Sequence, residues 1–98
     1  MLASSGVLQT LRDHRGEMTT RFGARHIGLF GSAARDQLGP SSDVDVLVEF
    51  DRQPTFALYC ELKDFLEDLV GRRVDLVTRR GLKPRAWQSV RQDLIDVA

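Results

Sequence analysis

The clearest pattern in the chain is a strict alternation over residues 43–50, where every second side chain is apolar. Successive side chains of a β-strand point to opposite faces, so the apolar set shares one face, and that face belongs to a core. The apolar set is Val44, Val46, Val48 and Phe50. The opposite face carries Asp43, Asp45, Leu47 and Glu49. The pattern predicts a strand that is buried on one side and carries carboxylates on the other.

Apolar residues at helical spacing predict two helices, and a proline predicts a third. The first helix covers residues 7–22 and should end at Gly23. The second should start at Pro54 and stop at Gly71. A last helix should follow Pro84. The apolar stripe of the second helix consists of Leu58, Leu62, Phe65, Leu66 and Leu69.

The segment between the first helix and the alternating strand divides into three short elements. Residues 26–30 are largely apolar and lead into Gly31, which fits a buried strand that ends at a tight turn. Residues 32–37 should form a short helix. Residues 39–42, with the sequence Gly-Pro-Ser-Ser, should form a turn that restarts the chain as an extended segment.

Two extended segments follow the second helix. Residues 74–77 predict a third strand, with Asp75 on the face opposite its apolar neighbours. Residues 94–97 offer an edge strand after the last helix. Together the elements predict an α+β fold, a small central sheet with helices packed against it, although the pattern does not fix the strand directions. At 98 residues we expect one domain, spanning residues 1–98.

Composition narrows the classes of partner. Fourteen basic and fourteen acidic residues cancel, so no overall field attracts nucleic acid or an anionic membrane. No apolar run is long enough to cross a bilayer, and the N-terminal residues lack the apolar core of a signal peptide. We therefore expect a cytoplasmic protein that does not bind a membrane and does not bind nucleic acid directly.

Cysteine and histidine give no sign of a zinc site. Cys60 is the only cysteine, which excludes an intramolecular disulfide and a thiolate cluster. We interpret it as a packing residue of the second helix. His14 and His26 have no second histidine or cysteine at ligand spacing, so we interpret both as surface or capping residues.

The paired carboxylates carry the first chemical signal. Asp43 and Asp45 lie two residues apart on one strand face, with Cα atoms about 6.5 Å apart, so their side chains can converge. Carboxylate oxygens suit hard divalent cations such as Mg²⁺, which keep open positions for phosphate oxygens. Phosphoryl transfer commonly uses a third carboxylate, and Asp75 on the next strand is the candidate. Taken singly, Asp43 could be a turn residue and Asp45 a solvated strand position.

The second signal is the turn after residues 26–30. A strand that passes through Gly31 into a helix exposes unpaired backbone N–H groups, which bind phosphate, and Ser32 adds a hydroxyl donor. Arg35 lies about one helical turn further on and can face the same ligand. No Gly-Lys-Ser or Gly-Lys-Thr follows this turn, which excludes a Walker-type phosphate loop.

Together these motifs resemble a known family. G-S-x-x-R, then S-D-x-D, then V-D-L on a later strand is similar to the nucleotidyltransferase superfamily that includes DNA polymerase β, and the short length resembles its minimal nucleotidyltransferase (MNT) branch. The likeness covers nearly the whole chain, including LKPR near the C-terminus. It implies a mixed sheet, ATP as donor and Mg²⁺ as cofactor. It assigns the nucleotide phosphates to Gly31, Ser32 and Arg35, and the metal and catalysis to Asp43, Asp45 and Asp75.

The resemblance also implies a partner. Proteins of this branch are typically encoded beside a HEPN-domain protein, with which they form a toxin–antitoxin pair. It implies that this chain is the antitoxin, forms a hetero-oligomer with the HEPN toxin, and transfers AMP from ATP to a tyrosine hydroxyl of that partner. The short chain leaves no room for an acceptor-binding domain, which agrees with a protein acceptor that supplies its own binding surface.

Two alternatives stay open at this point. The chain could be a binding module that holds nucleotide or metal and neutralises its partner by occlusion. It could also be the nucleotidyltransferase subunit of an enzyme that modifies RNA or a small molecule, for which the basic C-terminal third is the only support. Spacing alone places no aromatic or amide group against a nucleobase. The basic residues are Arg72, Arg73, Arg79, Arg80, Lys83, Arg85 and Arg91.

Overall fold

The sheet of the computed structural model has four strands in the order β3-β2-β1-β4. Strand β1 pairs antiparallel with β2 and β4, whereas β2 and β3 are parallel, so the sheet is mixed as expected. The structure describes residues 4–39 and 41–97; the predicted turn therefore lies partly outside the described residues, at Pro40. The strands are β1 (Ala24–Phe30), β2 (Val44–Phe50), β3 (Val74–Thr78) and β4 (Ile95–Asp96).

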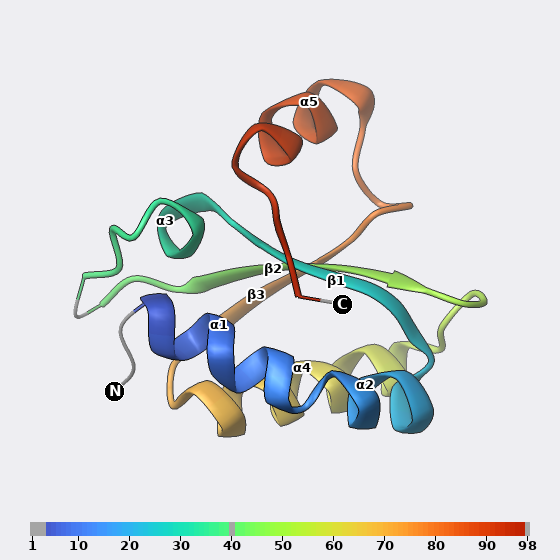
Figure 1. Cartoon of the computed structure of the whole chain (residues 1–98). Coiled ribbons are helices and arrows are strands. Elements are labelled where there is room, and N and C mark those ends of the chain that lie inside the picture. The colour runs from blue at the N-terminus through green and yellow to red at the C-terminus, as the bar shows by residue number, and fades with distance from the viewer. Residues whose placement is uncertain (1–3, 40, 98) are drawn as a thin grey trace.

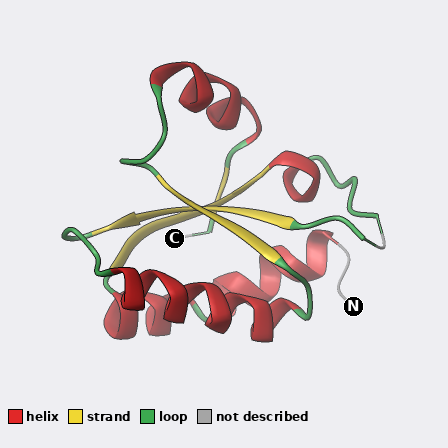
Figure 2. Cartoon of the chain, turned by 180° about the vertical axis from the view of Figure 1, so that it is seen from behind, coloured by secondary structure: helices red, strands yellow, loops and turns green. Residues whose placement is uncertain are grey.

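The helices divide unequally between the two faces of the sheet. Figure 1 shows α1, α2 and α4 below the sheet and α5 alone above it, with α3 at one end. The view from behind shows the same two layers (Figure 2). Within the described residues, no helix has the length and apolar character needed to span a bilayer. The helices are α1 (Ser4–Asp13), α2 (Arg15–Phe22), α3 (Gly31–Ala34), α4 (Phe56–Val70) and α5 (Pro84–Asp93).

The core lies between the sheet and the three-helix layer, and it confirms the face predicted from the alternation. Val44, Val46 and Val48 are fully buried there, next to Leu62 and Leu66 of α4. The other face of the sheet is covered by α5 only in part, since Asp75 is exposed and Asp45 half-buried. The polar face of β2 is therefore accessible to a ligand.

Three helix predictions differ from the structure. The short helix predicted over residues 32–37 is α3, Gly31–Ala34, and the chain leaves the helical conformation at Asp36, which has a φ of +57°. The first predicted helix is divided into α1 and α2 at His14, whose backbone N–H bonds to the carbonyl of Leu11, three residues back, and so tightens the turn. Helix α4 starts after Pro54: its N-cap is Thr55, whose hydroxyl accepts a hydrogen bond from the N–H of Leu58. Both predicted glycine stops are confirmed, because Gly23 and Gly71 end α2 and α4 in the left-handed conformation.

Candidate active site

Register brings two of the three predicted carboxylates into direct contact. Asp45 on β2 pairs in register with Asp75 on β3, so the two carboxylates lie side by side on the same face of the sheet. Asp43 immediately precedes β2 and is close enough to act on the charge of Asp45. The three carboxylates therefore gather at the end of the sheet where β2 and β3 begin.

The turn at Gly31 touches the same cluster. Phe30, the last residue of β1, pairs with Asp45, so the chain turns into α3 directly beside that carboxylate. Gly31 has a φ of +65°, a conformation that favours glycine, and a Cβ atom there would collide with the Asp45 carboxylate. Glycine at position 31 therefore lets the turn and the Asp45 carboxylate approach each other.

The environment of Asp45 disfavours its negative charge. Burial raises its pKa first, and the neighbouring charges of Asp75 and Asp43 raise it further. Arg35 acts in the opposite direction and lowers the pKa, but the net direction is upward. A cation bound here would stabilise the ionised carboxylates, because it would offset their mutual repulsion.

Two arginines directly before β3 contact Asp43 and the loop that precedes it. The Nε atom of Arg73 lies 3.7 Å from a carboxylate oxygen of Asp43, but this pair is largely exposed and contributes little stability. Arg72 donates hydrogen bonds to the carbonyls of Gly39 and Ser42, at 2.7 and 3.3 Å. We conclude that Arg72 fixes the loop that leads into Asp43. Its place among several basic residues of the sequence did not predict this structural role.

Arg35 lies in the predicted region but has a protein partner. It follows α3, and its guanidinium forms an ion pair with Asp93 at the end of α5 and donates a hydrogen bond to Gln37. It remains near enough to Asp45 to lower the pKa of that carboxyl. No local pattern indicated Asp93 as a partner of Arg35, because the contact joins segments 58 residues apart.

Ser32 lies half-buried in the first turn of α3. Its hydroxyl donates no hydrogen bond to any residue that the structure describes. The residue before the helix is Phe30, whose side chain cannot cap the N–H groups of this turn. Helix α3 has only four residues, so its dipole is small, and the binding capacity of the turn rests on its N–H groups and the Ser32 hydroxyl.

The donor set suits Mg²⁺, although it is not a closed cage. Among residues 4–39 and 41–97, no set of three histidine, cysteine, aspartate or glutamate side chains is arranged to hold a metal. Mg²⁺ is usually bound through one or two carboxylates together with substrate phosphates, which needs no such cage. The three clustered carboxylates beside an uncapped turn have this chemistry, because each supplies hard oxygen ligands and their mutual repulsion favours a cation.

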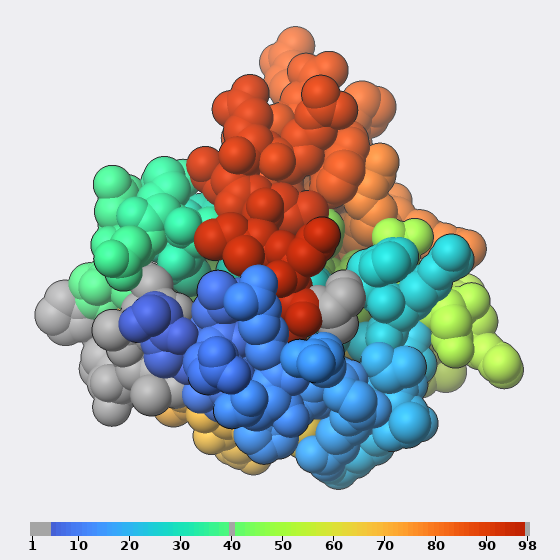
Figure 3. Space-filling view, viewed as in Figure 1, coloured from blue at the N-terminus to red at the C-terminus, as the bar shows by residue number. Residues whose placement is uncertain are grey.

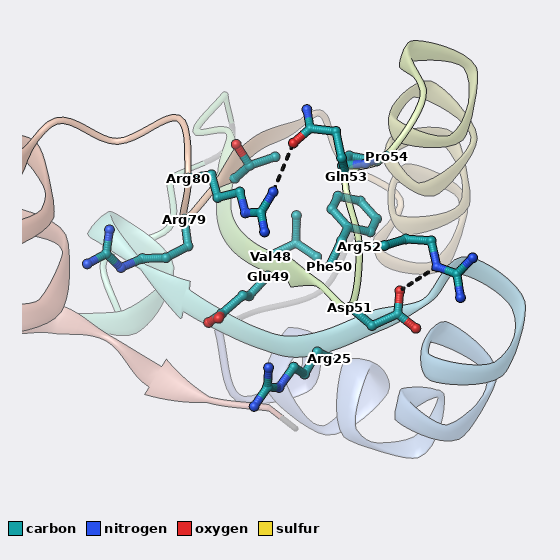
Figure 4. Close-up of a pocket in the computed structure, with 11 residues that line it drawn as sticks. Arg25, Val48, Glu49, Phe50, Asp51, Arg52, Gln53, Pro54, Arg79 and Arg80 are labelled. Atoms are coloured by element: carbon teal, nitrogen blue, oxygen red, sulfur yellow. Dashed lines mark hydrogen bonds and ion pairs between the residues drawn. The ribbon is translucent and has the colours of Figure 1, made fainter.

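A second hollow lies at the opposite end of the strands and does not share this chemistry. Figure 4 shows it: a pocket of about 150 Å³ around Val48 and Phe50, with four arginines on its walls. Its lining on β2 begins at Val48, three residues beyond Asp45, a distance of about 10 Å. Its position separates it from the carboxylates. The four arginines are Arg25, Arg52, Arg79 and Arg80.

Comparison with known sequences identifies the family to which the chain is similar. Residues 11–97 match the model of the nucleotidyltransferase domain. The protein adenylyltransferase MntA of Thermococcus cleftensis is 39% identical over 97 residues, which is 99% of this chain and 98% of the relative.

Solved structures have the same fold. A structure provisionally named a minimal nucleotidyltransferase superposes with a TM-score of 0.75 at 41% identity, covering 90% of this chain and 93% of that one. An MNT antitoxin in complex with a tri-AMPylated HEPN toxin of Shewanella oneidensis superposes with a TM-score of 0.68 at 20% identity, and the match covers 93% of this chain and 71% of that one. A toxin–antitoxin structure with AMP-PNP superposes with a TM-score of 0.71 at 24% identity, and the match covers 99% of this chain and 73% of that one. The last two likenesses concern the fold alone.

Proposed function

The chain belongs to the nucleotidyltransferase domain family and to its minimal nucleotidyltransferase (MNT) branch, and from this premise we propose that it transfers AMP from ATP to a hydroxyl of a partner protein. One observation carries the proposal. The Asp45–Asp75 pair lies directly against the uncapped Gly31–Ser32 turn, so groups suited to a metal and to phosphates adjoin one another.

The proposed reaction gives each group a role. The acceptor oxygen forms a bond to the α-phosphorus of ATP, the bond from that phosphorus to the bridging oxygen breaks, and pyrophosphate leaves. The hydroxyl proton passes to Asp75, which is exposed on the edge strand β3 and accessible to a group on another protein. The Gly31–Ser32 turn holds the terminal phosphates, and Arg35 adds positive charge beside them.

Asp43, Asp45 and Asp75 would hold Mg²⁺, which supplies positive charge to the phosphate oxygens when it is bound. The protein's own contribution is to position these carboxylates. The parallel pairing of β2 with β3 sets Asp45 beside Asp75, and the loop fixed by Arg72 sets Asp43.

We propose a HEPN-domain toxin as the acceptor and a tyrosine hydroxyl as the group that is modified. The relative in Thermococcus cleftensis is named a protein adenylyltransferase, and an MNT antitoxin of the same fold is bound to an AMPylated HEPN toxin. In this proposal the chain is an antitoxin and works in a hetero-oligomer.

The reaction class is tested by the position of the label on ATP. With ATP radiolabelled at the α-phosphate, we expect the HEPN partner to become labelled. With label at the γ-phosphate it should stay unlabelled, because pyrophosphate is released. Label transferred from the γ-position would identify a kinase and overturn the proposal.

Ser32→Ala should weaken ATP binding by about tenfold, because a hydroxyl that donates to a charged phosphate is lost. Calorimetry with ATP and Mg²⁺ measures this change. Ser89→Ala is the matched control: Ser89 is exposed on α5, and its removal should leave ATP affinity unchanged. Equal affinities for the Ser32 variant and wild type would remove Ser32 from the phosphate site.

Asp43→Asn should change ATP affinity in opposite directions in the presence of Mg²⁺ and in a chelator. In the wild type, replacing a chelator with Mg²⁺ should raise ATP affinity by about tenfold. In the variant most of this gain should vanish, whereas affinity in the chelator should rise, because a carboxylate that repels the triphosphate has been neutralised. Calorimetry under both conditions measures the effect, and the same Mg²⁺ dependence in both proteins would contradict a ligand role for Asp43.

A further inference from the structure

A cavity of about 180 Å³ lies between α5 and the sheet face that carries the carboxylates. Gly28 and Leu47, which are register partners on β1 and β2, lie on its sheet side, and Leu94 also lines it. Leu47 is two residues after Asp45 on the same strand face, about 6.6 Å away. The space-filling view shows α5, in orange and red, standing out from the body of the molecule beside the green segment that includes α3 (Figure 3).

The cavity and the Gly31–Ser32 turn lie on opposite sides of Asp45 along β2. The register sets Phe30 opposite Asp45, so the Gly31–Ser32 turn lies toward the start of β2. Leu47 and the cavity lie on the other side of Asp45, toward the end of that strand. A nucleotide with its terminal phosphates at the turn and its α-phosphate at Asp45 therefore extends its nucleoside toward the cavity.

Its size and lining match one heteroaromatic ring system. Pockets that hold a whole drug-sized ligand are roughly 300–1,000 Å³, so this volume suits part of a nucleotide. The apolar side chains offer contact to a flat ring, while Glu49 and Asp96 offer carboxylates and Trp87 offers its indole ring.

Two polar groups on these walls have no hydrogen-bond or ion-pair partner among the described residues. Among the described residues, the carboxylate of Glu49 and the indole N–H of Trp87 take part in no hydrogen bond or ion pair. The Trp87 ring is nevertheless fixed, because the guanidinium of Arg79 lies over it at 3.9 Å from the ring centroid. The cavity therefore presents an oriented aromatic ring and unpaired polar groups.

We propose that this cavity binds the nucleobase of ATP, an inference that rests on the proposed nucleotidyl transfer. The adenine ring lies against Leu47 and Trp87, and its exocyclic amine donates a hydrogen bond to the Glu49 carboxylate. The arginine-lined hollow of Figure 4 shares Glu49 and Arg79 with this cavity, but it extends away from the carboxylates, toward Phe50 and Pro54.

The base contact can be observed directly, because Trp87 is the only tryptophan in the chain. AMP should change the emission of Trp87, whereas tripolyphosphate, which lacks a base, should bind without changing it. A change of equal size with both probes would report a general response of α5 and would overturn the proposal.

Substitutions separate the base contact from the phosphate contact. Trp87→Ala should weaken AMP binding by about tenfold in calorimetry, the loss expected when an aromatic ring stacked on a base is removed. It should leave tripolyphosphate binding unchanged, which also shows that the variant is folded. Trp87→Phe keeps a ring and should retain most of the AMP affinity. Phe56→Ala, which removes an exposed aromatic residue of α4, is the control and should have no effect.

The role of Glu49 is tested by comparing ATP with ITP, which replaces the exocyclic amine of the base with an oxygen. Wild type should bind ATP about tenfold more tightly, and Glu49→Ala should bring the ratio close to one. ATP binding with unchanged Trp87 emission, and with unchanged affinity in Trp87→Ala, would overturn the base site and leave the transfer reaction standing. Absence of ATP binding by the wild type would overturn both.

Discussion

Asp45→Asn should abolish AMP transfer and at the same time stabilise the metal-free protein. Transfer should fall by about a thousandfold or more, because the amide cannot supply the charge that compensates a cation beside the phosphates. The folded state should gain up to about 1 kcal/mol, several degrees in Tm, because the substitution removes a negative charge directly opposite Asp75.

The gain in stability should depend on pH with a defined sign. The surroundings raise the pKa of Asp45 in the folded protein, so its ionisation disfavours folding. The stabilising contribution of the protonated carboxyl is complete below its unfolded pKa and is lost as the pH rises through its folded pKa. The advantage of Asp45→Asn should therefore be present at pH 7 and should vanish below about pH 4.

Thermal unfolding in a chelator, at both pH values, measures this effect next to transfer assays on the same samples. Asp68→Asn is the matched control, because Asp68 is an exposed carboxylate on α4. It should change neither stability nor transfer. A variant at Asp45 that is folded, supplied with Mg²⁺ and still active at the wild-type rate would remove Asp45 from the reaction.

Gly31→Ala should reduce both the stability of the protein and the rate of AMP transfer, although it adds only one methyl group. Its Cβ would enter the space of the Asp45 carboxylate while the backbone holds a φ of +65°. We expect a loss of roughly 1–3 kcal/mol in the free energy of unfolding. Transfer by the molecules that remain folded should fall by about a hundredfold, since the turn and the carboxylate must separate.

Gly71→Ala is the control that separates backbone strain at a positive φ from the collision of the Cβ atom with Asp45. Gly71 has nearly the same φ, +66°, but a Cβ there meets no atom within 4 Å. It should cost about 1 kcal/mol of stability and leave the transfer rate of the folded protein unchanged. Chemical denaturation and initial rates of transfer measure both variants. If Gly31→Ala behaved like Gly71→Ala in both assays, the close approach of turn and carboxylate would have no role in the reaction.

The elements and the carboxylate cluster were predictable because each rests on local chemistry. Alternation along residues 44–50 follows from burial of one face of β2, and that face is buried in the core. The glycine stops follow from the left-handed conformation that a helix end requires. Asp43 and Asp45 were expected together because they lie two residues apart, and Asp75 was the candidate for the third carboxylate because it lies on the next predicted strand.

The features that sequence reasoning missed join distant segments. The parallel register of β2 and β3 decides that Asp75 meets Asp45, and alternation carries no information on register between strands. The Arg35–Asp93 ion pair and the cavity beside Trp87 exist only because α5 returns over the sheet. The start of α4 was placed too early because Pro54 lies next to Thr55, whose hydroxyl provides the actual cap.

The most direct test of the central claim is the intact mass of a co-expressed HEPN partner, measured with wild-type chain and with the Asp43→Asn/Asp45→Asn double variant. We expect the partner to gain the mass of one or more AMP groups with the wild type and none with the double variant. An unmodified partner in both samples, with the toxin still neutralised in both, would contradict nucleotidyl transfer and identify the chain as an occluding antitoxin.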